Sequence, residues 1–161
     1  MTGVLALTAG GTIDKVYTVS GDLDPGPSCL PDVLAEGCCE VEFSIVEVLR
    51  KDSLEMTVAD RNLLRQHVVD APFDHILITH GTDTIIQTAR ALVGVPGKTV
   101  VLTGAMQPRS FRRSDAAFNV GFALAALSLL PPGVFVAMHG KIFQPDRIRK
   151  DRDEGKFVTS D

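Results

Sequence analysis

The sequence predicts an α/β protein: a mostly parallel central sheet between two layers of helices, a three-layer α/β/α arrangement of the flavodoxin or Rossmann kind. Short runs rich in Val, Ile and Leu alternate with longer segments of helical periodicity, as in βαβ units. The runs are apolar on both faces, as expected of strands covered on two sides. With 161 residues, the chain is expected to form one domain over residues 1–161.

Five segments are expected to be strands because they are short, apolar and rich in β-branched residues. They are residues 4–8, 41–49, 75–79, 99–103 and 134–138. Alternation of polar and apolar residues is only partial in 41–49, which favours a less buried position for that strand.

Three helices are expected between these strands. The first follows Thr57 and Asp60, which resemble a capping box, and carries apolar residues at helical spacing through Val68. The second begins near Thr82 or Asp83 and stops at Gly94, because glycine commonly terminates helices.

The third helix runs from Ser114 to Leu130 and ends before two prolines. Residues 18–31 are rich in Gly, Pro, Asp and Ser and are predicted to be a loop.

Composition excludes several functional classes. The net charge is −4 with no clustered basic face, so the chain is not expected to bind nucleic acid. The longest apolar stretch, 116–130, is shorter than the roughly 20 residues that span a bilayer, so no membrane association is expected. The N-terminus lacks the basic region of a secretory signal, and the three cysteines form no C-x-x-C pair. A cytoplasmic protein with reduced thiols is therefore expected.

The first polar motif is Thr8-Ala9-Gly10-Gly11-Thr12, directly after the first strand. Two glycines let the backbone turn sharply and approach a ligand, and Thr12 then presents a hydroxyl at the sheet edge. The motif lacks the G-x-G-x-x-G pattern of dinucleotide-binding proteins and the glycine–lysine pattern of phosphate loops. The alternative is a simple turn with a capping threonine.

The second motif is Thr79-His80-Gly81-Thr82-Asp83-Thr84, after the third strand. It places hydroxyls, a carboxylate and backbone N–H groups at a predicted helix N-terminus, which favours an anion or an oxyanion. The alternative is that Thr82 or Asp83 only caps the helix.

Together the two motifs resemble the two signatures of the L-asparaginase family, in order, separation and placement after strands. The resemblance extends to a tyrosine segment at Tyr17, to Ser53, to residues 103–119 and to the segment Met138–Lys150. It covers essentially the whole chain but only the N-terminal domain of the usual family member.

The resemblance implies an amidohydrolase that converts L-asparagine to L-aspartate and ammonia, with glutamine as a possible side substrate. Thr12 would be the nucleophile, and Tyr17 would close over the site with its loop and assist it. Thr82 and Lys150 would form a second hydroxyl–amine pair, with Asp83 nearby. A lysine can act as a base only if its pKa is depressed.

The resemblance also implies the substrate contacts. Asp83 would bind the α-ammonium group and Ser53 the α-carboxylate, while backbone N–H groups near Gly11 and Thr82 would form the oxyanion hole. No cofactor is implied, and no pair of histidines has convincing metal-ligand spacing, so no metal is predicted.

Several of these residues have an ordinary alternative role. Tyr17 is alternatively an exposed loop aromatic, and Ser53 an ordinary loop serine. Lys150 lies in a run of mixed charge, which is typical of a solvated face. His80 is expected to fix local backbone geometry, while His139 has no predicted role.

The usual family member has a second domain that supplies an acidic contact to the substrate ammonium of a neighbouring subunit. That domain is not in this sequence, so another acidic group is needed, because an unpaired charge in a closed pocket is costly. The acidic tail, residues 151–161, is one candidate and would reach a partner subunit. A homo-oligomer is expected from the resemblance alone.

Two other functions stay open at this level. One is a non-catalytic amino-acid-binding or regulatory module on the same fold. The other is a flavodoxin-like nucleotide-binding domain, against which the missing phosphate loop argues. Asparagine and glutamine differ by one methylene, which changes the binding free energy by only about 1–3 kcal/mol, and no residue pattern in the sequence favours either substrate.

Overall fold

A computed structural model describes residues 3–160 and confirms the three-layer α/β fold. Its central sheet has six strands in the order β4-β1-β5-β6-β7-β8, and all neighbours are parallel except β7 and β8. The strands are β1 (Val4–Gly10), β4 (Phe43–Lys51), β5 (His75–Thr79), β6 (Thr99–Thr103), β7 (Gly133–Met138) and β8 (Lys141–Phe143).

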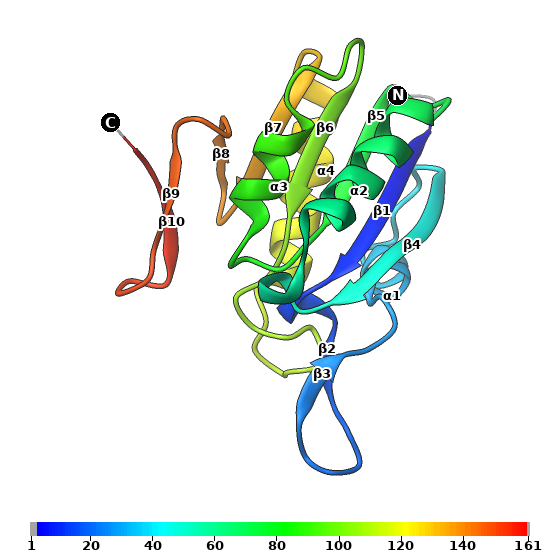
Figure 1. Cartoon of the computed structure of the whole chain (residues 1–161). Helices are drawn as coiled ribbons and strands as arrows, with labels where there is room; N and C mark the ends of the chain where they lie inside the picture. Colours follow the sequence, from blue (N-terminus) through cyan, green and yellow to red (C-terminus); the bar gives the residue numbers. More distant parts are fainter. Residues whose placement is uncertain (1–2, 161) are drawn as a thin grey trace.

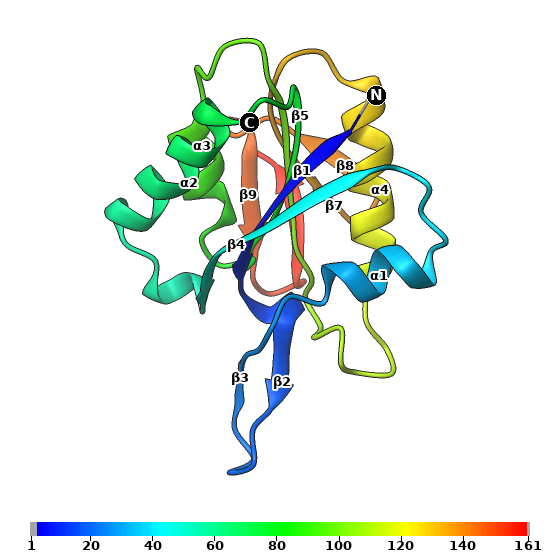
Figure 2. The same cartoon turned by 90° about the vertical axis from the view of Figure 1, so that its right-hand side faces the viewer.

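Helices cover both faces of the sheet (Figures 1 and 2). One layer holds α1 (Leu30–Glu36) and α4 (Ala116–Leu129), and the other holds α2 (Val58–Asp70) and α3 (Ile85–Leu92). Because side chains alternate along a strand, β1 buries Leu5 and Leu7 on the α2/α3 side and Ala6 on the α1/α4 side. This two-sided burial explains the continuous apolar runs in the sequence.

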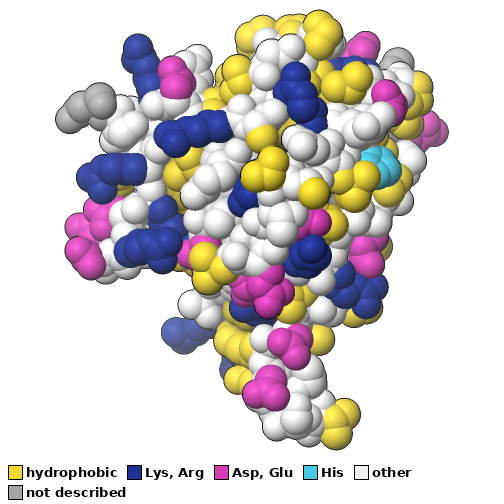
Figure 3. All heavy atoms as spheres, in the orientation of Figure 1, with side chains coloured by type: hydrophobic (Ala, Val, Ile, Leu, Met, Phe, Trp, Pro, Cys, Tyr) yellow, Lys and Arg dark blue, Asp and Glu magenta, His cyan; other side chains and the backbone are white. Residues whose placement is uncertain are grey.

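Two hairpins lie outside the main sheet. The first, β2 (Lys15–Tyr17) with β3 (Leu23–Pro25), projects from the body below the carboxyl end of β1. The second, β9 (Ile148–Asp151) with β10 (Lys156–Thr159), follows β8 and carries charged side chains of both signs (Figure 3). Ile148 and Phe157 anchor the second hairpin in the core on the α2/α3 side.

The main elements agree with the sequence predictions. The strands predicted at 75–79 and 99–103 have those bounds, and the other three differ by a few residues at their ends. The capping box is confirmed: the Thr57 hydroxyl accepts the Asp60 N–H, and the Asp60 carboxylate accepts the Thr57 N–H. Among the described residues, no helix has the length and apolar character that crossing a membrane requires.

Two local predictions were wrong. Residues 18–31 are not all loop, since they contain β3 and the start of α1. The helix expected from Thr82 or Asp83 begins only at Ile85, with Thr84 as a cap residue whose side chain makes no capping bond. The reason is that the preceding side chains bind elsewhere: the Thr84 hydroxyl donates to the Ser53 carbonyl, and the Asp83 carboxylate accepts from Lys150.

The acidic tail is not a free arm. Residues Lys156–Thr159 pair with β9, so that Phe157 stands opposite Lys150, and Phe157 is buried. The expectation that residues 151–161 reach a partner subunit stays a prediction, and Asp161 lies outside the described residues. Burial of an aromatic side chain favours docking on the chain's own core.

Candidate active site

The carboxyl ends of β1 and β5 meet in backbone contact because glycines stand there. Gly11 has a φ of 88°, and a Cβ atom on it would lie 2.3 Å from the Cα of Gly81. Only glycine tolerates both the positive φ and this approach. The close packing brings the segment carrying Thr12 against the segment carrying Thr82.

Ser53 lies at the same place. It begins a short 3₁₀ helix after β4 and is 2% exposed. A Cβ atom on Gly81 would lie 2.6 Å from the Ser53 Oγ atom, so this hydroxyl borders the loop after β5. The Thr84 hydroxyl donates to the Ser53 carbonyl over 2.7 Å and ties the two segments together.

Lys150 joins this edge from the β9–β10 hairpin. Its Nζ atom donates to Thr82 Oγ1 over 2.9 Å and to Asp83 Oδ1 over 2.7 Å. The Lys150 side chain is only 13% exposed, so the solvated-face alternative is wrong. Arg152 adds a more distant contact, 3.5 Å from the same Asp83 oxygen. The structure therefore brings together the three residues that the resemblance grouped.

Thr12 follows Gly11 as the first residue of a 3₁₀ helix and is half-buried. None of the side-chain hydrogen bonds within residues 3–160 involves its hydroxyl, which leaves that group available to a ligand. The Gly11 N–H donates to the Lys51 carbonyl over 2.9 Å. Gly11 thus contributes through close backbone packing, and its amide is not a free donor for an oxyanion.

Tyr17 does not lie in the buried cluster. It ends β2 on the projecting hairpin, is 65% exposed, and stacks on Phe111 with ring centroids 6.0 Å apart. A tyrosine on a projecting hairpin can reach the site only if the hairpin bends toward the sheet edge.

His80 is fully buried beneath the site. Its Nδ1 atom lies 2.8 Å from the Gly81 carbonyl and its Nε2 atom 2.8 Å from the Thr88 hydroxyl. Burial lowers the pKa of His80 to about 4, so the ring is neutral at pH 7. Since a carbonyl can only accept, Nδ1 carries the proton and Nε2 accepts from Thr88. This agrees with the expectation that His80 fixes local backbone geometry.

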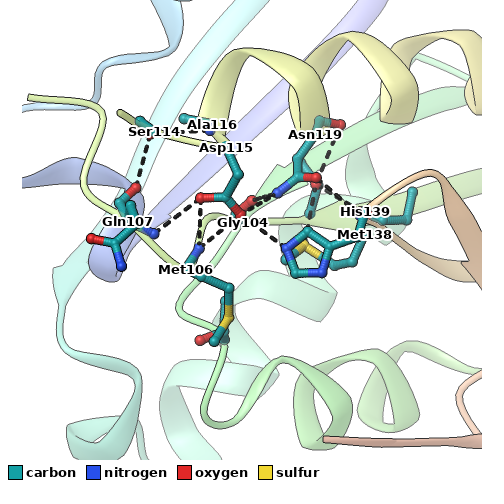
Figure 4. A network of polar contacts seen from close by, with 12 residues as sticks. Gly104, Met106, Gln107, Ser114, Asp115, Ala116, Asn119, Met138 and His139 are labelled. Carbon is teal, nitrogen blue, oxygen red and sulfur yellow. Dashed lines mark hydrogen bonds and ion pairs between the residues drawn. The ribbon is translucent and has the colours of Figure 1, made fainter. Parts of the chain in front are cut away.

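A second polar cluster was missed by sequence reasoning. It centres on Asp115, at the start of α4, and includes Asn119 and His139 (Figure 4). The sequence offered only one signal, the resemblance of residues 103–119, which assigned no role to Asp115. Within residues 3–160, no group of three or more His, Cys, Asp or Glu side chains is arranged to hold a metal ion.

The family model described as "Asparaginase, N-terminal" matches residues 3–155. The chain belongs to the asparaginase family. Among curated relatives, an L-asparaginase from Thermococcus kodakarensis is 37% identical over 158 residues, covering 91% of this chain and 47% of that protein. One subunit of the glutamyl-tRNA(Gln) amidotransferase from Aeropyrum pernix is 33% identical over 153 residues, covering 86% of this chain and 35% of that protein. The chain thus spans less than half of the length of each of these two relatives.

Solved structures give the same family. The thermostable L-asparaginase from Thermococcus kodakarensis superposes with a TM-score of 0.86 at 31% identity, covering 98% of this chain and 51% of that one. L-asparaginase I from Vibrio cholerae superposes with a TM-score of 0.84 at 26% identity, covering 99% of this chain and 52% of that one. The asparaginase fold therefore extends over nearly all the described residues.

Proposed function

We propose that this chain acts as an amidohydrolase that converts L-asparagine to L-aspartate and ammonia with Thr12 as the nucleophile. One observation carries the proposal: the bonded cluster Lys150–Thr82–Asp83 stands at the same sheet edge as the unengaged Thr12 hydroxyl. Membership of the asparaginase family supports it.

The proposed reaction has two steps. The Thr12 oxygen attacks the side-chain carboxamide carbon while its proton passes to a base, and the C–N bond then breaks as the nitrogen takes a proton and leaves as ammonia. Water attacks the resulting threonine ester, giving aspartate and restoring the Thr12 hydroxyl. Backbone amides facing the developing oxyanion would contribute about 3–4 kcal/mol each.

The Thr82–Lys150 pair supplies the proton-transfer group in this scheme. Lys150 must lose a proton before it can accept one, and Thr82 lies within hydrogen-bond reach of its Nζ atom. Both ion-pair contacts of Asp83 use Oδ1, so its second oxygen is assigned to the substrate ammonium. Ser53 is assigned to the substrate carboxylate.

The β2–β3 hairpin is proposed as the lid. Its tip residues are exposed, and Tyr17 stands at the end of β2 nearest the tip. Closing the hairpin would bring Tyr17 over Thr12 and exclude water from the ester. A homo-oligomer in the cytoplasm, in which a neighbour supplies a further acidic group, remains our expectation for the working protein.

The direct test is ammonia release from L-asparagine and L-glutamine by the purified protein. Thr12→Ala is expected to abolish release, lowering the rate at least about a thousandfold, because the nucleophile is gone. Thr12→Ser keeps a hydroxyl and is the matched control, which should retain measurable activity. Equal rates for wild type and Thr12→Ala would contradict the assignment.

The relatives also favour a second candidate function. The Aeropyrum pernix relative belongs to an amidotransferase acting on glutamyl-tRNA(Gln). The corresponding role here would be amide hydrolysis within a larger assembly. Release of ammonia that appears only after a partner protein is added would favour this role, whereas release by the isolated chain favours a free hydrolase. A folded wild type that binds asparagine without turnover would instead indicate the non-catalytic module.

A further inference from the structure

Asp115 gathers hydrogen-bond donors from three segments of the chain. Its carboxylate accepts the backbone N–H of Met106 over 3.0 Å and that of Gln107 over 3.0 Å. It also accepts Asn119 Nδ2 over 2.9 Å and lies 3.0 Å from His139 Nε2. These donors hold the pKa of Asp115 below its usual 3.8 against the opposing effect of burial, so the group is an anion at neutral pH.

Asp115 does not cap its own helix, although aspartate at a helix start usually does. It occupies the residue before α4, yet its side chain makes no capping bond to the first turn. The carboxylate points instead at the loop after β6, as Figure 4 shows. Only one of its donors, Asn119, belongs to α4, and the others come from that loop and from the turn after β7, so stabilising α4 is not its main role.

Asn119 and His139 complete the cluster. The fully buried Asn119 donates to the Gly104 carbonyl over 2.9 Å and accepts the His139 N–H over 3.0 Å. His139 holds a φ of 52°, which is uncommon for a residue other than glycine. The backbone of the turn after β7 is thus fixed so that its imidazole faces Asp115.

The loop held by Asp115 borders Thr82 on one side and the turn of the hairpin that carries Lys150 on the other. On one side, a Cβ atom on Gly104 would lie 2.3 Å from the His80 carbonyl and 3.5 Å from Thr82 Cγ2. On the other side, the Met106 Cε atom lies 3.9 Å from where a Cβ on Gly155 would stand, in the turn of the hairpin that carries Lys150. The same loop and turn border a shallow recess of about 450 Å³ that also includes Asp115 and His139.

From these contacts we infer that Asp115 is a positioning residue for the Thr82–Lys150 pair. By binding two successive amides of the loop after β6, it fixes the surface on which Thr82 and the Lys150 hairpin both rest. Asn119 and His139 hold the carboxylate in place. The role in turnover rests on the proposed function, whereas the role in placing Lys150 does not.

The test uses Asp115→Asn in the full chain, with two readouts. The first is the kinetics of ammonia release, where kcat is expected to fall about tenfold or more with KM within about twofold, because small misplacements of reacting groups are costly. The second is competitive acetylation of lysines followed by mass spectrometry, which needs no turnover. Lys150 should label at least about twofold faster than in wild type, relative to Lys98, which donates to carbonyls at the opposite end of β6.

Two further variants sharpen the result. Asp60→Asn is the matched control, since Asp60 also accepts a backbone N–H and an amine but caps α2; it should leave kcat and Lys150 labelling unchanged. His139→Asn tests the cluster without removing Asp115, because asparagine accepts a positive φ. It should move both readouts in the same direction by a smaller factor, and it replaces Asp115→Asn if that variant does not fold.

The possible results distinguish the positioning role of Asp115 from the proposed amidohydrolase function. A folded Asp115→Asn with wild-type Lys150 labelling overturns the positioning role, whereas altered labelling with wild-type kcat overturns the role of Asp115 in turnover. A wild type that releases no ammonia sinks the proposed function, while faster Lys150 labelling in the variant still supports the positioning of Lys150.

Discussion

At the residue scale, the buried His80 makes the stability of the protein depend on pH. Its folded-state pKa of about 4 lies below the ordinary 6.5, so below pH 6.5 the unfolded chain binds a proton that the folded chain does not. The contribution of His80 to the free energy of unfolding is therefore at its full value above pH 6.5 and is lost as the pH falls toward 4. The loss is of the order of 3 kcal/mol.

Urea unfolding between pH 4 and pH 7 checks this expectation. His80→Asn should be less stable at pH 7, because two buried hydrogen bonds change, but its stability should depend less on pH in this range. If the free energy of unfolding changed with pH by the same amount in wild type and in His80→Asn, His80 would not control the pH dependence of stability.

Residue-scale prediction from sequence succeeded where a motif fixed the neighbours. Thr82 and Asp83 follow the buried strand β5 after only His80 and Gly81, so their place at the sheet edge is set by the strand. The contact of Lys150 with them was implied only by resemblance, since 68 residues separate Lys150 from Thr82. The Asp115 cluster was not predictable, because it depends on how a loop, a helix and a turn lie against one another.

At the element scale, the glycine contacts between β1 and β5 control whether the two loops can meet. Gly11→Ala would place a methyl group 2.3 Å from the Gly81 backbone at a φ of 88°, so we expect a loss of about 2 kcal/mol or more and loss of activity. Gly121→Ala is the matched control: its Cβ meets nothing within 4 Å in the helical α4, so a gain of about 0.5–1 kcal/mol is expected.

Denaturant titration of both variants measures the expected loss of stability in Gly11→Ala and the expected gain in Gly121→Ala. Equal stability changes for Gly11→Ala and Gly121→Ala would mean that the loops can separate without cost, against the close packing described above.

Element prediction worked best for the buried strands, since β5 and β6 are covered on both faces and show continuous apolar runs. It missed α1, β2, β3, β8 and the β9–β10 hairpin. These are short and contain proline or charged residues, so their local sequences resemble loops, and tertiary packing determines their structure. Leu30 and Phe157, for example, are buried only because α1 and β10 dock on the sheet layers.

At the scale of the whole molecule, β10 holds Lys150 in place although it contributes no residue to the proposed chemistry. A chain truncated after Lys150 loses the strand opposite Lys150 and the buried Phe157. We expect ammonia release to fall at least about a hundredfold while the main sheet stays folded. Steady-state kinetics with circular dichroism checks this, and full activity in a folded truncated chain would contradict it.

The separation of Thr12, Thr82 and Lys150 along the chain also has a kinetic consequence. The parallel pairs β1–β5 and β5–β6 join distant segments, and such contacts form slowly because long loops must close first. The two strands of the hairpin that carries Lys150 are close in sequence, yet the hairpin can dock only on a sheet that is already assembled. During refolding, regular secondary structure should therefore precede the return of the complete cluster, and a partly folded chain would hold Thr12 in place before it holds Lys150.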